Sequence, residues 1–288
     1  MKIGVGYPAY IPWSKPAGLL EWARRADQGP FSSLGTIDRL VYGNYDPLTA
    51  LTAAAAVTSR IRLMTTVLLA ALHSPALLAK QAATLDAFSG GRLTLGIGVG
   101  SREDDFIAAK AAYRNRGKRL EEQVATMKRI WSGKPPSPDL GPIGPAPARQ
   151  GGPELLLGGY TPAAISRAGR LADGFITGGV GVPEMVARSY QMVAKAWEEA
   201  GRPGKPRFVS AIYVAIGEDP AGRGSEYLRN YYGPMAERIA QGLRTTSQAV
   251  EEAIKGFAAI GADELILWPT VPDLEQLDRL AEIAAKAA

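Results

Sequence analysis

Two strand-to-helix turns carry the residues of this chain that are best suited to bind an anion. In each turn a short apolar strand ends in a glycine pair, and in the first a threonine and a proline then begin a helix. Backbone N–H groups and the positive end of a helix meet at such a turn, so it can bind a phosphate without a lysine. Each turn alone is also an ordinary capped connection, but two adjacent ones favour a phosphate site. The residues concerned are Gly158, Gly159, Tyr160 and Thr161 in the first turn and Gly178 and Gly179 in the second.

A third glycine-rich strand end lies in the first half of the chain. The apolar run 93–97 contains Gly96 and continues into Gly98 and Gly100. A strand without side chains at its carboxyl end leaves room for a large flat ligand against its backbone. The spacing is not the G-x-G-x-x-G of a dinucleotide-binding turn, and no acidic residue closes a second strand about 20 residues further on. We therefore interpret this strand end as one wall of a cofactor site.

Few side chains are available for acid–base or nucleophilic chemistry. His73 is the only histidine and cysteine is absent, which excludes a multi-histidine or thiolate metal site and a cysteine nucleophile. His73 follows a strand and is interpreted more simply as a loop residue or the start of a helix. Asp38 and Arg39 leave a predicted strand at its carboxyl end and are candidates for a polar role, although such neighbours are often a structural ion pair. Thr65 and Thr66 end another apolar strand, where periodicity alone makes them ordinary β-branched strand residues.

Composition argues against several classes of partner. The chain has 288 residues, 46% of them hydrophobic, and a formal net charge of +5 with 33 Lys and Arg scattered among 28 Asp and Glu. No basic run with interleaved aromatic residues occurs, which argues against nucleic acid as a partner. No stretch approaches the roughly 18 uninterrupted apolar residues of a membrane span, and the chain starts on a strand pattern without a secretory signal. Together with the absence of cysteine, this favours a cytoplasmic protein.

Strand and helix signals alternate from one end of the chain to the other. Most strand candidates are short apolar runs, as expected for strands covered on both faces. Eight strands alternating with eight helices predict a single α/β domain over residues 1–288, a (β/α)8 TIM barrel, with an open doubly wound sheet as the rival. The predicted strands are 2–6, 34–37, 61–68, 93–97, 154–157, 174–177, 207–216 and 264–268. The predicted helices are 17–27, 47–58, 75–88, 118–132, 162–172, 183–200, 246–260 and 273–286.

Two excursions interrupt this alternation. Residues 133–153 are rich in proline and glycine, and we expect them to lie over or beside the mouth of the barrel, at the carboxyl ends of the strands. Residues 219–245 contain Tyr227, Tyr231 and Tyr232 and either form a helix packed on the outside or cover the pocket. The segments expected to shape a substrate pocket are 7–16, 101–115, 133–153 and 219–245.

In order and spacing, several motifs resemble those of the bacterial luciferase-like flavin-dependent oxidoreductases, and the resemblance extends over nearly the whole chain. It implies a TIM barrel that binds FMN, or the deazaflavin coenzyme F-420, at its carboxyl-terminal mouth. The matching features are Pro75, Leu85-Asp86, residues 89–93, the strand 95–100, residues 157–159 and residues 172–174.

Carried over position by position, the resemblance implies where the cofactor lies. The phosphate would be held by residues 158–161 together with Gly178 and Gly179. A non-proline cis peptide is implied between Thr66 and Val67, beneath the flavin ring. The ring would be bordered by Thr65, Thr66 and the wall from Gly98 to Gly100.

Two departures from the family pattern limit what can be carried over. Arg39 stands where many relatives have a histidine after the acid at the end of the second strand. Gly98 stands where luciferases have a reactive cysteine. A histidine-dependent step and light emission are therefore not expected.

Three functions remain open. The first is a two-component monooxygenase, in which a separate flavin reductase supplies FMNH2 and the barrel uses it with O2 to oxygenate a small organic substrate. Asp38 or Arg39 would then act near the substrate, and Tyr7, Tyr10 and Trp268 would form apolar walls, although packing explains these three equally well. The second is hydride transfer with coenzyme F-420, whose acidic tail would favour basic residues along an open groove. The third is a non-catalytic flavin-binding partner subunit. A homodimer is the assembly that the resemblance suggests.

Overall fold

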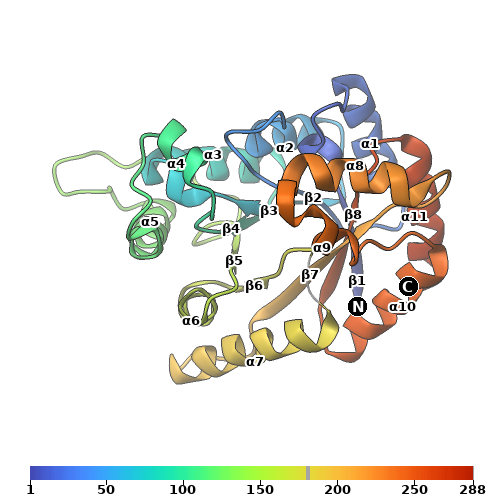
Figure 1. Ribbon diagram of the computed structural model, residues 1–288. Helices are drawn as coiled ribbons and strands as arrows, with labels where there is room; N and C mark the ends of the chain where they lie inside the picture. Colours follow the sequence, from blue (N-terminus) through green and yellow to red (C-terminus); the bar gives the residue numbers. More distant parts are fainter. Residues whose placement is uncertain (180–181, 288) are drawn as a thin grey trace.

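The computed structural model describes residues 1–179 and 182–287 and closes eight parallel strands into a barrel. Each strand pairs with the next one along the chain, and β8 pairs back onto β1 (Figure 1). The closure confirms the predicted (β/α)8 barrel and excludes the open sheet, which would have two edge strands. The strands are β1 Lys2–Gly6, β2 Ser33–Thr36, β3 Arg62–Leu68, β4 Leu93–Ile97, β5 Glu154–Gly158, β6 Gly174–Ile176, β7 Arg207–Val214 and β8 Glu264–Pro269.

Eight long helices cover the outside of the barrel and agree with the predicted ranges to within about two residues. Asp46, Thr161 and Thr246 each accept a backbone N–H as the N-cap of α2, α6 and α10, as their residue types favour. None of the helices in the described parts of the chain is long and apolar enough to cross a membrane. These helices are α1 Pro16–Gln28, α2 Pro47–Ala56, α3 Pro75–Phe88, α5 Arg116–Trp131, α6 Pro162–Leu171, α7 Pro183–Glu199, α10 Ser247–Ala259 and α11 Leu274–Ala287.

Further helices, of which only one within residues 219–245 was among the predicted alternatives, follow the carboxyl ends of strands. They therefore lie on the mouth side of the barrel, where ligands of this fold bind. They are α4 Glu103–Ala108 after β4, α8 Pro220–Tyr232 and α9 Ala236–Ala240 after β7, and the 3-10 turns Pro8–Tyr10, Ala70–Leu72 and Gly233–Met235.

The segment 133–153 lies at the end of the barrel opposite the mouth, so the expectation that it covers or borders the mouth was wrong. Ala148 N donates to Asp86 Oδ2 at 2.8 Å, and Asp86 stands near the end of α3, where the chain has returned to the amino ends of the strands. The physical reason is the direction of the chain. The segment joins α5 to β5, and in this fold helix-to-strand connections lie at the amino ends of the strands. In Figure 1 it is the pale green loop beyond α5.

The middle of the barrel is filled by apolar side chains. Because side chains alternate along a strand, every second residue points inward. The inward residues form a hydrophobic cluster separate from the one that packs strands against the outer helices. A ligand must therefore bind above this layer. Members of the inner cluster include Met64, Leu156, Ile176, Val209 and Ile266.

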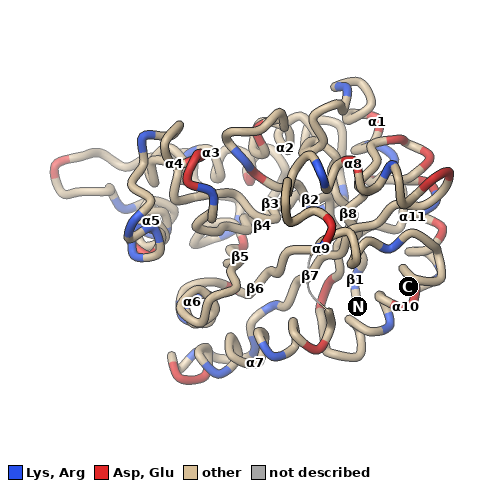
Figure 2. The backbone as a smooth tube through the Cα atoms, viewed as in Figure 1, with Lys and Arg blue, Asp and Glu red and all other residues tan. Residues whose placement is uncertain are grey.

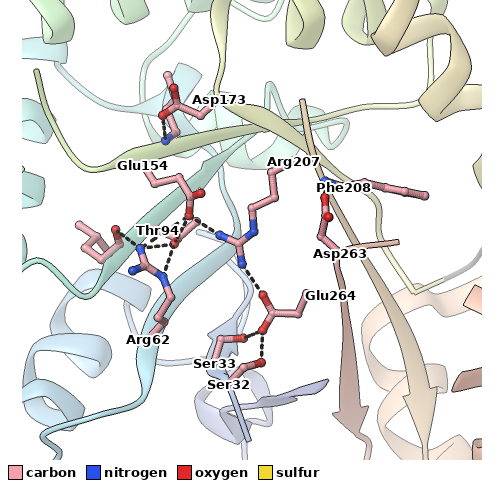
Figure 3. Close-up of polar contacts among 12 residues, drawn as sticks. Ser32, Ser33, Arg62, Thr94, Glu154, Asp173, Arg207, Phe208, Asp263 and Glu264 are labelled. Atoms are coloured by element: carbon pink, nitrogen blue, oxygen red, sulfur yellow. Dashed lines mark hydrogen bonds and ion pairs between the residues drawn. The ribbon is translucent and has the colours of Figure 1, made fainter. Parts of the chain in front are cut away.

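The amino end of the barrel is closed by a charged network (Figure 3). Arg207 forms ion pairs with both Glu154 and Glu264, and Glu264 is only 1% exposed. Thr94 donates to Glu154 at 2.7 Å, and Ser33 donates to Glu264 at 2.6 Å. These contacts join several strands in one set of paired charges, which leaves the carboxyl end as the place for binding and chemistry.

Candidate active site at the carboxyl ends of the strands

The carboxyl end of the barrel has a covered half and an open half. In the covered half, Tyr227 of α8 is fully buried, with its ring centroid 5.3 Å from that of Tyr10 and 6.1 Å from that of Tyr213. In the open half, at the end of β5, Tyr160 is 67% exposed. Of the two alternatives for residues 219–245, the structure therefore favours a cover over the mouth.

Side-chain contacts with three different strand ends hold the cover in place. The loop after β2, the loop after β4 and β7 itself each provide one anchor for the last turn of α8. The anchors are the hydrogen bond from Tyr42 to Asn230 Oδ1, the one from Arg102 to the carbonyl oxygen of Tyr231, and the hydroxyl pair Tyr213–Tyr232 at 2.8 Å.

Both ends of this excursion are joined at the end of β7. Val214 forms a parallel bridge with Arg244. Arg244 N donates to Tyr213 O at 3.0 Å, and Ala215 N donates to Arg244 O at 2.9 Å. The chain therefore leaves the barrel and returns to it at a single point.

Val67 occupies the space that the glycines of β4 leave free. The Thr66–Val67 peptide is cis, as the resemblance implied, and the register of β3 against β4 shifts there. A Cβ placed on Gly98 would lie 2.9 Å from a Val67 methyl, and one on Gly158 would lie 3.2 Å from the other. Gly98 is thus buried behind Val67, and the half-buried Val67 side chain, rather than the Gly98 backbone, faces the mouth.

The two predicted threonines differ in what their hydroxyls do. Thr65 Oγ1 donates to Gly96 O at 2.6 Å, so it ties β3 to β4. Thr66 Oγ1 is buried and has no hydrogen-bond partner among the described residues, and the same holds for Thr36 Oγ1 at the end of β2. Buried polar atoms without a partner are costly unless a ligand supplies one. Thr66 is therefore the better candidate for contact with a bound group.

The structure brings most residues of the two predicted phosphate turns together. Thr161 caps α6 by accepting from Ala164 N at 3.2 Å, and since Pro162 has no N–H, the N–H of Ala163 is the earlier donor that the helix leaves for a ligand. A Cβ on Gly178 would lie 2.4 Å from the Tyr160 hydroxyl, so Tyr160 reaches from the end of β5 to the end of β6. Gly179 is buried instead against the aromatic cover, where a Cβ would meet the Tyr213 ring at 3.0 Å.

Asp38 and Arg39 are both held by neighbouring groups. Asp38 Oδ2 accepts from Leu69 N at 2.9 Å and lies 3.9 Å from Nε2 of His73, which places the single histidine beside this acid. The Arg39 side chain is only 9% exposed and pairs with Asp104 at 2.7 Å. Its positive charge is therefore balanced before any ligand binds.

Asp105 positions the loop that carries Arg39, and sequence reasoning missed it. The residue is 1% exposed, and its Oδ1 accepts from Leu40 N at 3.2 Å and from Val41 N at 2.6 Å. Its Oδ2 lies 3.6 Å from Arg39 Nε. The acidic start of α4 was the visible signal, but nothing local in the sequence relates it to a loop some 65 residues earlier.

Two of the three predicted wall residues, Tyr10 and Trp268, pack in the aromatic cluster beneath the cover, together with Tyr213 and Tyr227. Tyr10 donates to Pro269 O at 2.6 Å, and its ring centroid lies 6.4 Å from that of Trp268. Trp268 is 3% exposed and its Nε1 has no partner among the described residues. Tyr7 instead packs in the core between the strands and the outer helices. Sequence reasoning also did not single out Tyr42, Arg102 or Tyr213 for this half of the site.

The barrel thus combines a cis peptide in β3, glycine-tipped ends of β5 and β6, and a cover after β7. The family model described as luciferase-like monooxygenase matches residues 3–287. The chain belongs to this family. The result confirms the resemblance derived from the sequence motifs.

Mycobacterial relatives match about half of the chain. An uncharacterised protein of Mycobacterium tuberculosis is 35% identical over 174 residues, which are 57% of this chain and 60% of that protein. A phthiodiolone/phenolphthiodiolone dimycocerosates ketoreductase of the same species is 32% identical over 169 residues, which are 55% of this chain and 44% of the ketoreductase. The matched part thus spans less than two thirds of either relative.

Solved structures of the same fold include enzymes of two kinds. The monooxygenase RslO1 from Streptomyces bottropensis superposes with a TM-score of 0.78 at 24% identity, covering 100% of this chain and 98% of that one. An F-420-dependent secondary alcohol dehydrogenase, solved with an F-420–acetone adduct, gives a TM-score of 0.82 at 19% identity, covering 100% and 99%. The oxygenating constituent of 3,6-diketocamphane monooxygenase from Pseudomonas putida, in complex with FMN, gives 0.78 at 18% identity, covering 99% and 98%. At these identities the likeness concerns the fold.

Proposed function

We propose that the protein is a flavin-dependent monooxygenase that takes FMNH2 from a separate reductase and uses O2 to oxygenate a small organic substrate. The observation that carries the proposal is the open half of the mouth, where the glycine-tipped ends of β5 and β6 and the start of α6 adjoin Val67. Membership of the luciferase-like monooxygenase family supports it.

The described residues fit FMN. Gly158, Tyr160, Thr161 and Gly178 would hold the phosphate, since the turns bring backbone N–H groups and a helix start to one place. Val67 offers an apolar face to a flat ring, and the unpartnered Thr66 hydroxyl offers a hydrogen bond to its polar edge. When bound, the reduced flavin supplies the electrons and the reaction with O2.

The protein's own contribution is to orient the substrate and to exclude water. The cover places buried aromatic rings above β7 and β8, and a dry site strengthens every polar interaction inside it. Asp38 and Arg39 stand at the rim and would orient a polar group of the substrate. Because the charge of Arg39 is already balanced by Asp104, Arg39 would orient the substrate by a directed hydrogen bond more than by attracting an opposite charge.

Hydride transfer with coenzyme F-420 is the second candidate, and one feature of the chain favours it. Residues 109–119, which lead from α4 into α5 on the mouth side, are rich in Lys and Arg and carry no acidic residue (Figure 2). Such a segment suits the acidic tail of coenzyme F-420. The ketoreductase relative and the F-420-dependent structural neighbour are consistent with this alternative.

Anaerobic titration of the purified protein with FMNH2, and separately with reduced F-420, tests the proposal. We expect tight binding of FMNH2 and, once O2 is admitted, consumption of one O2 per oxygenated product with water as the other product. Selective binding of reduced F-420 without oxygen uptake would transfer the protein to the hydride-transfer class. Binding of neither would favour the non-catalytic partner subunit.

A matched pair of variants tests the phosphate turn. Thr161→Ala and Thr246→Ala each remove one helix N-cap, at about 1 kcal/mol of stability. Only Thr161→Ala is expected to weaken FMN binding, by about threefold to tenfold, while leaving the affinity for riboflavin, which has no phosphate, unchanged. Equal FMN affinities of the two variants would argue against this position for the phosphate.

A further inference from the structure

Arg102 is a positive charge at the mouth that no acidic side chain balances among the described residues. Its guanidinium donates to the carbonyl oxygen of Tyr231 and lies 5.4 Å from the centroid of the Tyr231 ring. In the described parts of the chain, no carboxylate oxygen lies within 4.0 Å of it, whereas Arg39 nearby pairs with both Asp104 and Asp105. The Arg102 guanidinium is therefore left without a direct carboxylate partner where residues 219–245 meet the loop after β4, although Asp38 and Asp105 also act on the neighbouring Tyr231 ring.

A cluster of partly exposed aromatic rings adjoins this charge through Tyr231. The ring centroids of Tyr42 and Tyr231 are 5.1 Å apart, and those of Tyr231 and Tyr232 are 4.8 Å apart. Unlike the fully buried tyrosines of the cover, these three retain exposed surface. They come from the loop after β2 and from α8, and the Tyr231 ring, which lies against Arg102, contacts both of the others.

The hydroxyls of these rings lie within reach of the Arg102 charge. That charge lowers the pKa of Tyr42, Tyr231 and Tyr232, but burial is the larger effect and leaves the pKa of Tyr42 and of Tyr231 at about 12. At neutral pH all three are therefore phenols, which can donate a hydrogen bond. The Tyr42 hydroxyl already donates to Asn230 Oδ1 and that of Tyr232 is paired with Tyr213, which leaves the Tyr231 hydroxyl as the donor beside the guanidinium. A guanidinium and a neighbouring phenolic donor together make a site that is complementary to an oxyanion.

We propose that Arg102, Tyr231 and Tyr232 bind the substrate, and that the substrate is an aromatic molecule with a negatively charged oxygen, a phenolate or a carboxylate. The inference rests on the proposed function in that it takes this ligand to be the molecule that is oxygenated. The aromatic faces can stack on a planar ring, and the guanidinium can donate hydrogen bonds to the oxyanion. An aliphatic substrate would leave the aromatic faces without a stacking partner, and a cationic substrate would be repelled by Arg102.

The phosphate of FMN is the other anion that could meet Arg102. The two anions can be distinguished by experiment. A substrate anion must bind at Arg102 while the flavin is also bound, whereas an anion that occupied a phosphate site would be displaced by FMN. The phosphate turns at β5 and β6 already provide a separate place for that group. We therefore assign Arg102 to the substrate.

The test measures equilibrium binding of 2-naphthoate to the cofactor-free protein by isothermal titration at pH 7. The neutral isostere 2-naphthamide serves as the comparison ligand. We expect 2-naphthoate to bind at least tenfold more tightly than the amide. Arg102→Met should abolish this preference while leaving the affinity for the amide within about twofold. Tyr231→Phe, which keeps the ring, should weaken binding of the anion a few-fold.

Controls separate this proposal from the fold and from the proposed function. Arg114→Met removes an exposed cation from the following loop and should change neither affinity. Circular dichroism and the melting temperature of each variant show whether the barrel is intact, and Arg102→Lys tests the charge where Arg102→Met disturbs α8. FMNH2 affinity of the same variants is expected to stay within about twofold of the parent protein.

Three results would overturn the assignment. They are equal affinities for the anion and the amide, retention of the preference in Arg102→Met, and displacement of 2-naphthoate by FMN in a competitive titration. In each case tight FMNH2 binding would leave the monooxygenase proposal standing. Loss of FMNH2 binding by the parent protein would instead remove the proposed function itself.

Discussion

The close approach of β3 explains why glycine recurs at alternate positions in and after β4. On the neighbouring strand, the Thr65 backbone lies against Gly96 and a Val67 methyl lies against Gly98, in both cases closer than a Cβ would normally approach. The repeated glycine was interpreted from the sequence as the wall of a cofactor site. Its direct cause is the close approach of β3, and the ligand-facing surface is one residue removed, at Val67.

Gly96→Ala is therefore expected to destabilise the protein. Its Cβ would lie 2.2 Å from the Thr65 carbonyl oxygen, a backbone atom that cannot move without disturbing β3. We expect a loss of about 1–3 kcal/mol in the free energy of unfolding, as for other overpacked sites, measured by urea denaturation. Gly141→Ala is the matched control, because nothing lies within 4 Å of its Cβ. Equal midpoints for the two variants would contradict the close-contact argument.

At the scale of elements, the cover is the part of the site that sequence reasoning located but could not place in three dimensions. The Thr161-Pro162 helix start and the apolar run of β4 are local patterns, so their elements were predicted correctly. Contact between Arg102 and Tyr231 joins residues 129 positions apart, and no periodicity relates them. The choice between outer helix and cover for residues 219–245 depended on such contacts.

The tyrosines of the cover predict how stability responds to alkali. Burial raises the pKa of Tyr42 and Tyr231 to about 12, and raises that of Tyr10, Tyr213 and Tyr227 well above the usual value. An unfolded chain releases these protons near pH 10. The stabilising contribution is thus complete below pH 10 and is lost as the pH rises from about 10 towards 12, at about 1.4 kcal/mol per pH unit for each such tyrosine.

Urea denaturation between pH 8 and pH 11, followed together with tyrosinate absorbance at 295 nm, measures this effect. We expect a nearly constant unfolding free energy up to pH 9.5 and a steep decline above it. Tyr227→Phe removes one buried phenol and should make the decline shallower. Ionisation of all tyrosines near pH 10 in a protein that stays folded would show that the cover does not bury them.

At the scale of the whole molecule, the barrel has two chemically different ends. Paired charges close the amino end, apolar side chains fill the middle, and aromatic rings and glycine-tipped strands form the carboxyl end. The alternation of strands and helices was enough to predict the barrel. Residues 133–153 join a helix to a strand, and such connections lie at the amino ends of the strands in this fold. The sequence therefore also contained the information needed to place that segment correctly.

Arg207→Met tests how much the charged end contributes to stability. The substitution leaves Glu154 and the buried Glu264 without their shared cation, and an uncompensated buried charge costs about 3–5 kcal/mol. The exposed pair of Arg223 with Asp273 provides the comparison, since Arg223→Met should cost at most about 1 kcal/mol. Chemical denaturation of both variants measures the difference. Similar losses would mean that water reaches the network and screens it.

The joined ends of the excursion after β7 have a consequence for how this family diversifies. Because Arg244 pairs with residues 213–215, the chain between them is a closed insert that the barrel does not need for its own closure. Such an insert can be exchanged or lengthened without changing the order of the strands, provided that the new segment again covers the apolar cluster to which Tyr227 and Leu228 belong. We therefore expect that residues 216–243 can be recombined as a cassette, which would change the molecules that the mouth accepts while the same barrel is kept.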